Sequence, residues 1–86
     1  MNTFLLNISS PDGEIFSGQV ARITVRGTEG DLAVMAGHVP FITSVKPGDC
    51  AVQLEDGSVK QAHTEGGLLT VTKETVTFLT SALDWA

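Results

Sequence analysis

Turn residues interrupt this sequence at short intervals, and no segment shows the hydrophobic period of a helix. Between the turns, apolar and polar residues alternate with the period of a strand that buries one face. The clearest case is residues 20–26, where Ala21, Ile23 and Val25 share one side of the segment. We therefore predict an all-β fold, a small β-sandwich or flattened barrel of about eight to ten short, mostly antiparallel strands.

The expected strands follow one another along the whole chain, which we treat as a single domain over residues 1–86. Asp56-Gly57 between two alternating segments is a strong hairpin signal. Only Ser81–Ala86 could begin a helix, and it ends before two turns are complete. We expect strands at residues 3–9, 14–16, 20–26, 32–35, 41–45, 50–55, 58–64, 68–72 and 75–80.

Composition excludes several classes of function. Ten acidic and five basic residues give a net charge of −5, which disfavours a nucleic-acid binder and a polybasic membrane-surface anchor. The single cysteine cannot form an internal disulfide, so we expect an intracellular, reducing compartment. We expect no signal leader at the start of the chain, and no segment approaches the roughly 20 apolar residues of a membrane-spanning helix.

The reactive side chains do not form a recognisable active site. His38 and His63 are expected in different hairpins, and neither has a ligand-type neighbour at metal-binding spacing. Cys50 alternates with Val52 and Leu54, which is typical of a buried apolar position. No phosphate-binding loop pattern follows the glycines. We therefore expect no catalytic, cofactor-binding or metal-binding residues.

The segment Gly27–Gly48 is the richest in turn residues and has two interpretations. It is either a tortuous connection in a small β domain or a protein-binding surface, and the residues alone favour neither. Glu29, Asp31 and His38 are expected to be exposed in its loops. One member of the pair Phe41-Ile42 must face outward if this short strand alternates.

Several short motifs occur in a fixed order over nearly the whole chain. They are Ile15–Gly18, Val25–Leu32, Gly37–Thr43, Lys46–Gly48, Gly66–Val71 and Val76–Leu79. With these motifs, the sequence resembles the amino-terminal β-sandwich of the epsilon subunit of bacterial F-type ATP synthases. The chloroplast subunit is similar.

The resemblance implies a rotor component and not an enzyme. It implies a central-stalk subunit of a proton- or sodium-translocating ATP synthase, which links the gamma subunit to the membrane c-ring. Such a subunit helps to couple ion-driven rotation to ATP synthesis in the catalytic head. The implied location is the cytoplasmic face of the bacterial cell membrane, to which the subunit is attached through its partners. No cofactor is implied.

The resemblance also implies contact residues. The positions that match those facing the c-ring in the family are Glu29, Gly30, Asp31 and His38. The positions that match those on the gamma side are Ser10, Phe41, Ile42 and Thr43. Exposed charges such as these steer and orient a partner, whereas an exposed apolar pair supplies the desolvated centre of a contact.

The family usually continues into a two-helix carboxy-terminal domain, and this sequence stops at residues 81–86, about where that domain would begin. It is either a naturally short subunit or a trimmed one, and for both we expect no self-inhibition and no nucleotide site. Without helices to cover it, Trp85 should pack back on the sandwich or on a partner. The alternatives are a stand-alone β-sandwich adaptor that binds another protein and, least favoured, a small hydrolase or metal protein.

Overall fold

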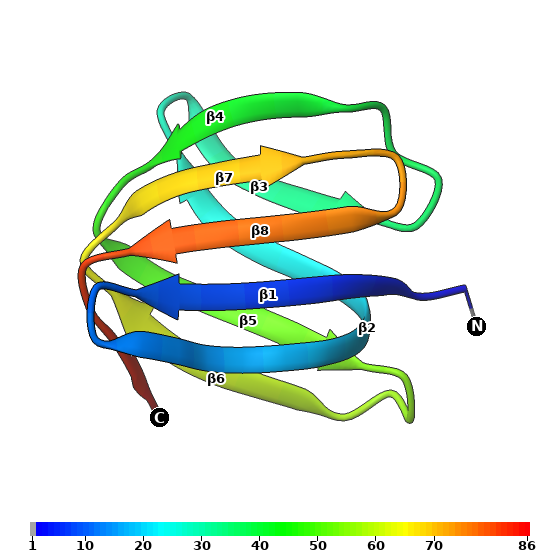
Figure 1. Ribbon diagram of the computed structural model, residues 1–86, viewed down its shortest axis with the longest axis horizontal. Helices are drawn as coiled ribbons and strands as arrows, with labels where there is room; N and C mark the ends of the chain where they lie inside the picture. Colours follow the sequence, from blue (N-terminus) through cyan, green and yellow to red (C-terminus); the bar gives the residue numbers. More distant parts are fainter. Residues whose placement is uncertain (1) are drawn as a thin grey trace.

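The computed structural model describes residues 2–86, and all regular secondary structure in that range is β. Figure 1 shows the arrangement of the strands. No helix in the described range is long and apolar enough to cross a membrane. The predicted all-β class is confirmed. The strands are β1 (Phe4–Ser10), β2 (Gly13–Gly27), β3 (Gly30–Met35), β4 (Phe41–Val45), β5 (Gly48–Leu54), β6 (Val59–Thr64), β7 (Gly67–Val71), β8 (Thr75–Thr80) and β9 (Leu83–Trp85).

The strands form one continuous hydrogen-bonded sheet that folds over into two layers. Its order is β1-β8-β7-β4-β2-β5-β6-β9, with β3 paired to β2 and β1 also paired to β2. One layer contains β4, β7, β8 and β1, which face the viewer in Figure 1, and the other contains β3, β5, β6 and the second half of β2. Only the pair β1–β8 is parallel among the described strands, so the predicted antiparallel character is confirmed.

The separate strands expected at residues 14–16 and 20–26 are wrong, because β2 runs without a break over 15 residues. Its first half pairs with β1 and its second half with β3 and β5, so the strand passes from one layer to the other. The expected break at Ser17-Gly18 stays extended. Ser17 Oγ donates a hydrogen bond to Asn7 Oδ1 at 2.8 Å, and Gly18 lies beside the ring of Phe16.

Ser81–Ala86, the one segment that could have begun a helix, does not do so, since Leu83–Trp85 forms the short strand β9 on the edge of β6. The exposed edge of β6 offers backbone groups that a new strand can pair. Ala86 N–H, for example, donates to Gln61 O at 2.8 Å. Trp85 packs back on the sandwich, as expected: its ring lies edge-to-face with Phe16 at 6.0 Å, and Lys60 Nζ lies 4.7 Å from its centre.

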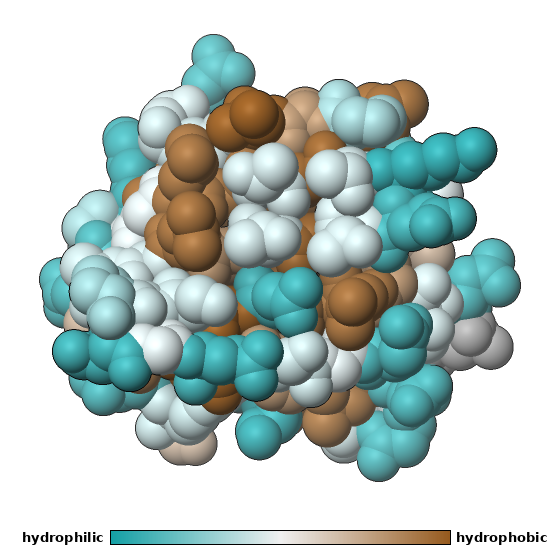
Figure 2. Space-filling view, in the orientation of Figure 1, coloured by the Kyte–Doolittle hydropathy of each residue, from teal (hydrophilic) through white to brown (hydrophobic). Residues whose placement is uncertain are grey.

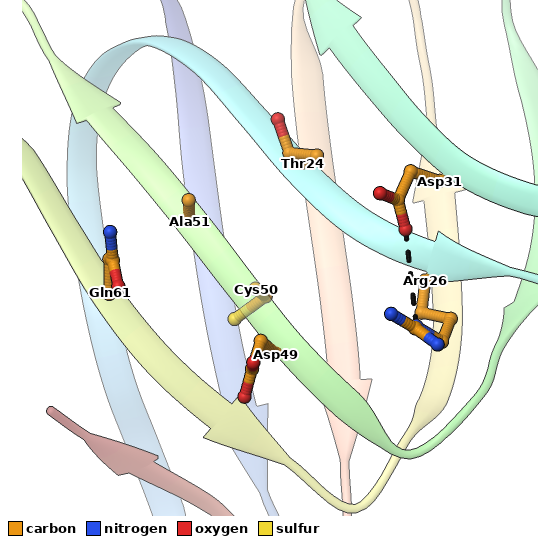
Figure 3. Close-up of a pocket in the computed structure, with 7 residues that line it drawn as sticks. All are labelled: Thr24, Arg26, Asp31, Asp49, Cys50, Ala51 and Gln61. Atoms are coloured by element: carbon orange, nitrogen blue, oxygen red, sulfur yellow. Dashed lines mark ion pairs between the residues drawn. The ribbon is translucent and has the colours of Figure 1, made fainter.

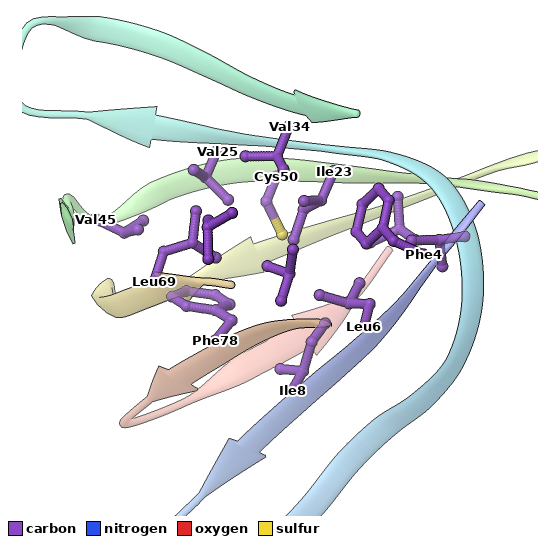
Figure 4. Packing of buried hydrophobic residues seen from close by; sticks show 14 of the residues in the cluster. Phe4, Leu6, Ile8, Ile23, Val25, Val34, Val45, Cys50, Leu69 and Phe78 are labelled. Carbon is purple, nitrogen blue, oxygen red and sulfur yellow. The ribbon is translucent and has the colours of Figure 1, made fainter. Parts of the chain in front are cut away.

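The core lies between the two layers and follows the predicted alternation. Phe78, Leu69 and Ile8 from one layer meet Ile23, Val25 and Val34 from the other (Figure 4). Ala21, Ile23 and Val25 are buried on a shared face of β2, whereas Arg22 and Arg26 point outward. The only buried polar side chains among residues 2–86 belong to Thr64 and Thr80.

Candidate interaction surfaces

The tip of the β2–β3 hairpin carries the exposed residues Glu29, Gly30 and Asp31. Gly27 pairs with Gly30 across the turn, and Gly30 has a φ of +125°, a conformation that glycine adopts without strain. The Asp31 carboxylate lies 3.9 Å from Arg26 Nε, with side chains 73% and 55% exposed. An ion pair this exposed contributes little stability. The charges of this tip therefore remain accessible to a partner.

A shallow polar hollow lies beside this tip on the outer side of β2, β5 and β6 (Figure 3). The residues that line it are Thr24, Arg26, Asp31, Asp49, Cys50, Ala51 and Gln61. The side chain of Cys50 is buried, and burial, with a smaller contribution from Asp49, raises the pKa of its thiol. A protonated, buried thiol is a poor nucleophile. Cys50 is therefore a residue of the core and not a reactive thiol, as predicted.

His63 has carboxylate neighbours that the sequence analysis did not find. Its Nδ1 lies 3.5 Å from Asp49 Oδ1, and its Nε2 lies 3.6 Å from Glu65 Oε1. Asp49 is the direct cross-strand partner of His63. A two-residue turn at Asp56-Gly57 would instead pair Asp49 with Thr64, so the turn motif alone does not reveal this contact. Among residues 2–86, no three histidine, cysteine or carboxylate side chains are arranged to hold a metal ion.

His38 lies at the opposite end of β3 from the tip, so the structure does not bring it together with Glu29 and Asp31. It follows β3 in the connection to β4 and is half-buried. Its Nδ1 lies 2.5 Å from Met35 O, its Nε2 lies 2.7 Å from Thr72 O, and its ring packs edge-to-face on Phe4 at 5.5 Å. Both polar atoms of the ring are thus engaged within the chain.

The residues of the expected gamma side are distributed over more than one surface. Along β4, Ile42 points outward and is 66% exposed, while Phe41 packs against the core and Thr43 is half-buried. The expectation that one member of Phe41-Ile42 faces outward is confirmed. Ser10 ends β1, and β7 and β8 lie between that strand and β4. The structure therefore does not bring Ser10 and Ile42 into contact.

The outer side of the β4–β7–β8–β1 layer has a distinct character, and we call it the uncharged face. Alternate residues point outward there, and none of them is charged: Leu5, Asn7, Ser9, Ile42, Ser44, Leu68, Thr70, Thr75, Thr77 and Leu79. Figure 2 looks onto this face, where brown and white surface occupies the centre and most of the teal lies at the periphery. Ile42, Leu68 and Leu79 are exposed by 66%, 41% and 50%.

Comparison with known proteins identifies the family of the chain. Residues 3–86 match the family described as ATP synthase, Delta/Epsilon chain, beta-sandwich domain. The chain belongs to this family. The resemblance stated from the sequence motifs is thereby confirmed, and with it the expectation that the domain is a structural and not a catalytic component.

Solved structures agree with this assignment. A chain in the cryo-EM structure of the Euglena gracilis mitochondrial ATP synthase, OSCP/F1/c-ring in rotational state 1, is 29% identical and superposes with a TM-score of 0.91. The match covers 96% of the delta/epsilon domain described here and 53% of the Euglena chain, so this domain spans about half of its relative. A chain of the Tetrahymena thermophila central stalk and c-ring structure shares the fold, with 16% identity, a TM-score of 0.76, and 92% and 63% of the two chains covered.

Proposed function

We propose that this chain is a central-stalk subunit of a proton- or sodium-translocating ATP synthase, in which it links the gamma subunit to the c-ring. In this role it couples ion-driven rotation to ATP synthesis. The proposal is supported by the family match over residues 3–86 and by the Euglena relative, whose structure contains F1 and a c-ring. The subunit would lie at the cytoplasmic face of a bacterial cell membrane, attached through its partners.

The proposed contact with gamma is supported chiefly by the uncharged face. The sequence holds ten acidic and five basic residues, yet none of them points outward from the middle of this layer. Depletion of charge around exposed aliphatic side chains is typical of the centre of a protein–protein interface. Ile42 lies near one edge of the face and Leu79 two strands away, so a partner resting on both would cover β4, β7 and β8.

The c-ring contact belongs to a different part of the molecule, the tip at Glu29, Gly30 and Asp31. Its carboxylates are exposed at a tight turn, where polar loops of a ring can approach them. Charges at such a rim direct the encounter and its orientation more than its affinity. His38 stands at the other end of β3, so we do not include it in this contact.

A binding titration against the isolated gamma subunit tests the first contact. We expect one-to-one binding, and we expect Ile42→Asp and Leu79→Asp each to weaken it at least about tenfold, because a buried charge would replace an apolar contact. Val59→Asp is the matched control, since Val59 is 52% exposed but lies on β6 in the other layer. Equal weakening by all three variants would contradict the assigned face. Absence of any binding by the folded chain would favour the stand-alone adaptor.

Charge reversal tests the second contact. Glu29→Lys should reduce co-sedimentation of the gamma-bound chain with detergent-solubilised c-ring, and the reduction should shrink as salt is added. Glu74→Lys makes the same change of charge in the β7–β8 turn, at the opposite end of the molecule. If Glu74→Lys has the larger effect, the tip does not face the ring.

A further inference from the structure

The two ring nitrogens of His38 both face backbone carbonyl oxygens. Nδ1 lies 2.5 Å from Met35 O, and Nε2 lies 2.7 Å from Thr72 O. A carbonyl oxygen only accepts hydrogen bonds, so each ring nitrogen must carry a proton to make a favourable contact. A neutral imidazole has one N–H donor, and its other nitrogen presents a lone pair. Only the doubly protonated, cationic ring satisfies both contacts.

The two carbonyls belong to segments that are far apart in the sequence. Met35 ends β3, and Thr72 begins the turn between β7 and β8. The ring of Phe4, at the start of β1, packs edge-to-face against the imidazole with an interplanar angle of 88° and fixes its orientation. His38 therefore joins the connection before β4 to the turn that follows β7, its hydrogen-bonded neighbour.

We propose that His38 is a proton-operated latch between these two segments. In the closed state, the cationic ring donates to Met35 O and Thr72 O at once. Loss of one proton leaves a lone pair facing a carbonyl oxygen at less than 3 Å, whichever nitrogen keeps its hydrogen. The ring then has to release one carbonyl, and the β3–β4 connection separates from the β7–β8 turn.

The charged side chains nearest along the packed elements are Lys73 and Glu74 in the β7–β8 turn and Arg22, which pairs with Met35 on β2. Among residues 2–86, none of these forms an ion pair with His38. The latch thus responds to the proton on His38 itself.

Nuclear magnetic resonance of the ¹⁵N-labelled chain tests the latch directly. The ring nitrogens and the backbone amides are followed from about pH 5 to about pH 8, the interval in which histidine usually changes charge. We expect both His38 nitrogens to be protonated at the acid end. On deprotonation, the amide signals of Gly37 and Lys73 should shift over the same pH interval as the ring.

The second histidine supplies an internal control. His63 is exposed and lies beside Asp49 and Glu65 on the other layer, so His63→Asn assigns the ring signals without touching the latch. His38→Gln keeps a hydrogen-bond donor but does not titrate, and it should abolish the shifts of Gly37 and Lys73. If that variant does not fold, the unmodified chain still shows whether the amide signals of Gly37 and Lys73 shift over the same pH interval as the His38 ring.

Three results would overturn the proposal. The first is a His38 ring with one unprotonated nitrogen at about pH 5, because such a ring cannot donate to both carbonyls. The second is deprotonation of the ring while Gly37 and Lys73 stay unchanged. The third is persistence of those amide shifts in His38→Gln, which would assign them to another titrating group such as Glu74.

Discussion

The hydroxyl oxygens of Thr64 and Thr80 lie 2.8 Å apart inside the sandwich, where the two side chains join the β6–β7 and β8–β9 connections. One assignment of protons satisfies the group. Gly66 N–H donates to Thr64 Oγ1 at 3.1 Å, Thr64 donates to Thr80, and Thr80 donates to Gly66 O at 2.7 Å. Glu65 N–H donates to Ala82 O at 3.0 Å beside them. This network of hydrogen bonds holds the β6–β7 and β8–β9 connections together at one end of the molecule.

Thr80→Val should destabilise the fold, because it keeps the shape of the side chain but removes the hydroxyl. Gly66 O loses its donor in a buried position, and we expect unfolding free energy to fall by about 2 kcal/mol. Urea unfolding followed by circular dichroism measures the change. Thr77→Val is the control, since Thr77 points outward on the same strand; a loss as large as that of Thr80→Val would argue against the network.

Gly66 and Gly57 form a matched pair for a second prediction. Their φ angles are +90° and +91°, so alanine suffers the same backbone strain at both, about 1 kcal/mol. A Cβ at Gly57 meets nothing within 4 Å, whereas at Gly66 it would lie 2.5 Å from Val45 O. Gly57→Ala should therefore be tolerated, and Gly66→Ala should lower stability by more than about 3 kcal/mol. Equal losses in urea unfolding would show that backbone strain alone decides.

Local pattern was enough to predict most of the strands and which of their faces are buried. Alternation along residues 20–26 identified the buried side chains in the second half of β2, because a pleated strand repeats every second residue. It could not predict that β2 continues through Ser17-Gly18. That continuity depends on pairing with β1 in one layer and with β5 in the other, and such pairing is not visible in the segment itself.

The arrangement of the candidate contact residues was harder to predict for the same reason. Asp31 and His38 are close in the sequence, but an intervening strand as short as β3 already separates its two ends by about 20 Å. Neither Leu68 nor Leu79 is marked as a contact residue by its local sequence. They become a surface only because β7 and β8 pair in a register that sets them side by side.

Trp85 provides the third prediction. Its ring contacts Phe16 and Lys60, so Trp85→Ala should loosen β9 and reduce stability by about 2 kcal/mol. Urea unfolding measures the loss, and Asp84→Ala in the same strand, an exposed position, should change it by less than about 0.5 kcal/mol. Because the chain has a single tryptophan, its fluorescence also reports whether β9 detaches before the sandwich unfolds. If Trp85→Ala leaves stability unchanged, the strand is not held by its side chain.

Cys50 gives a prediction on pH. Burial raises the pKa of its thiol above that of the unfolded chain, so the unfolded state loses the proton first as pH rises. The stability linked to this group is fully present below about pH 8.5, the usual value of the free thiol, and declines above it. Urea unfolding at a series of alkaline pH values should show this decline, and Cys50→Ala should remove that part of it.

The same burial makes alkylation of Cys50 by iodoacetamide an independent measurement. In the folded chain Cys50 is 4% exposed and burial favours its protonated thiol, so the reaction should be slow and should accelerate with urea in parallel with unfolding. A rate in native buffer equal to that of a free thiol would mean that strand β5 opens readily. That outcome would contradict the burial on which the pH prediction depends. If alkylation is slow but the stability of Cys50→Ala declines with pH as much as that of the unmodified chain, other groups cause the alkaline decline.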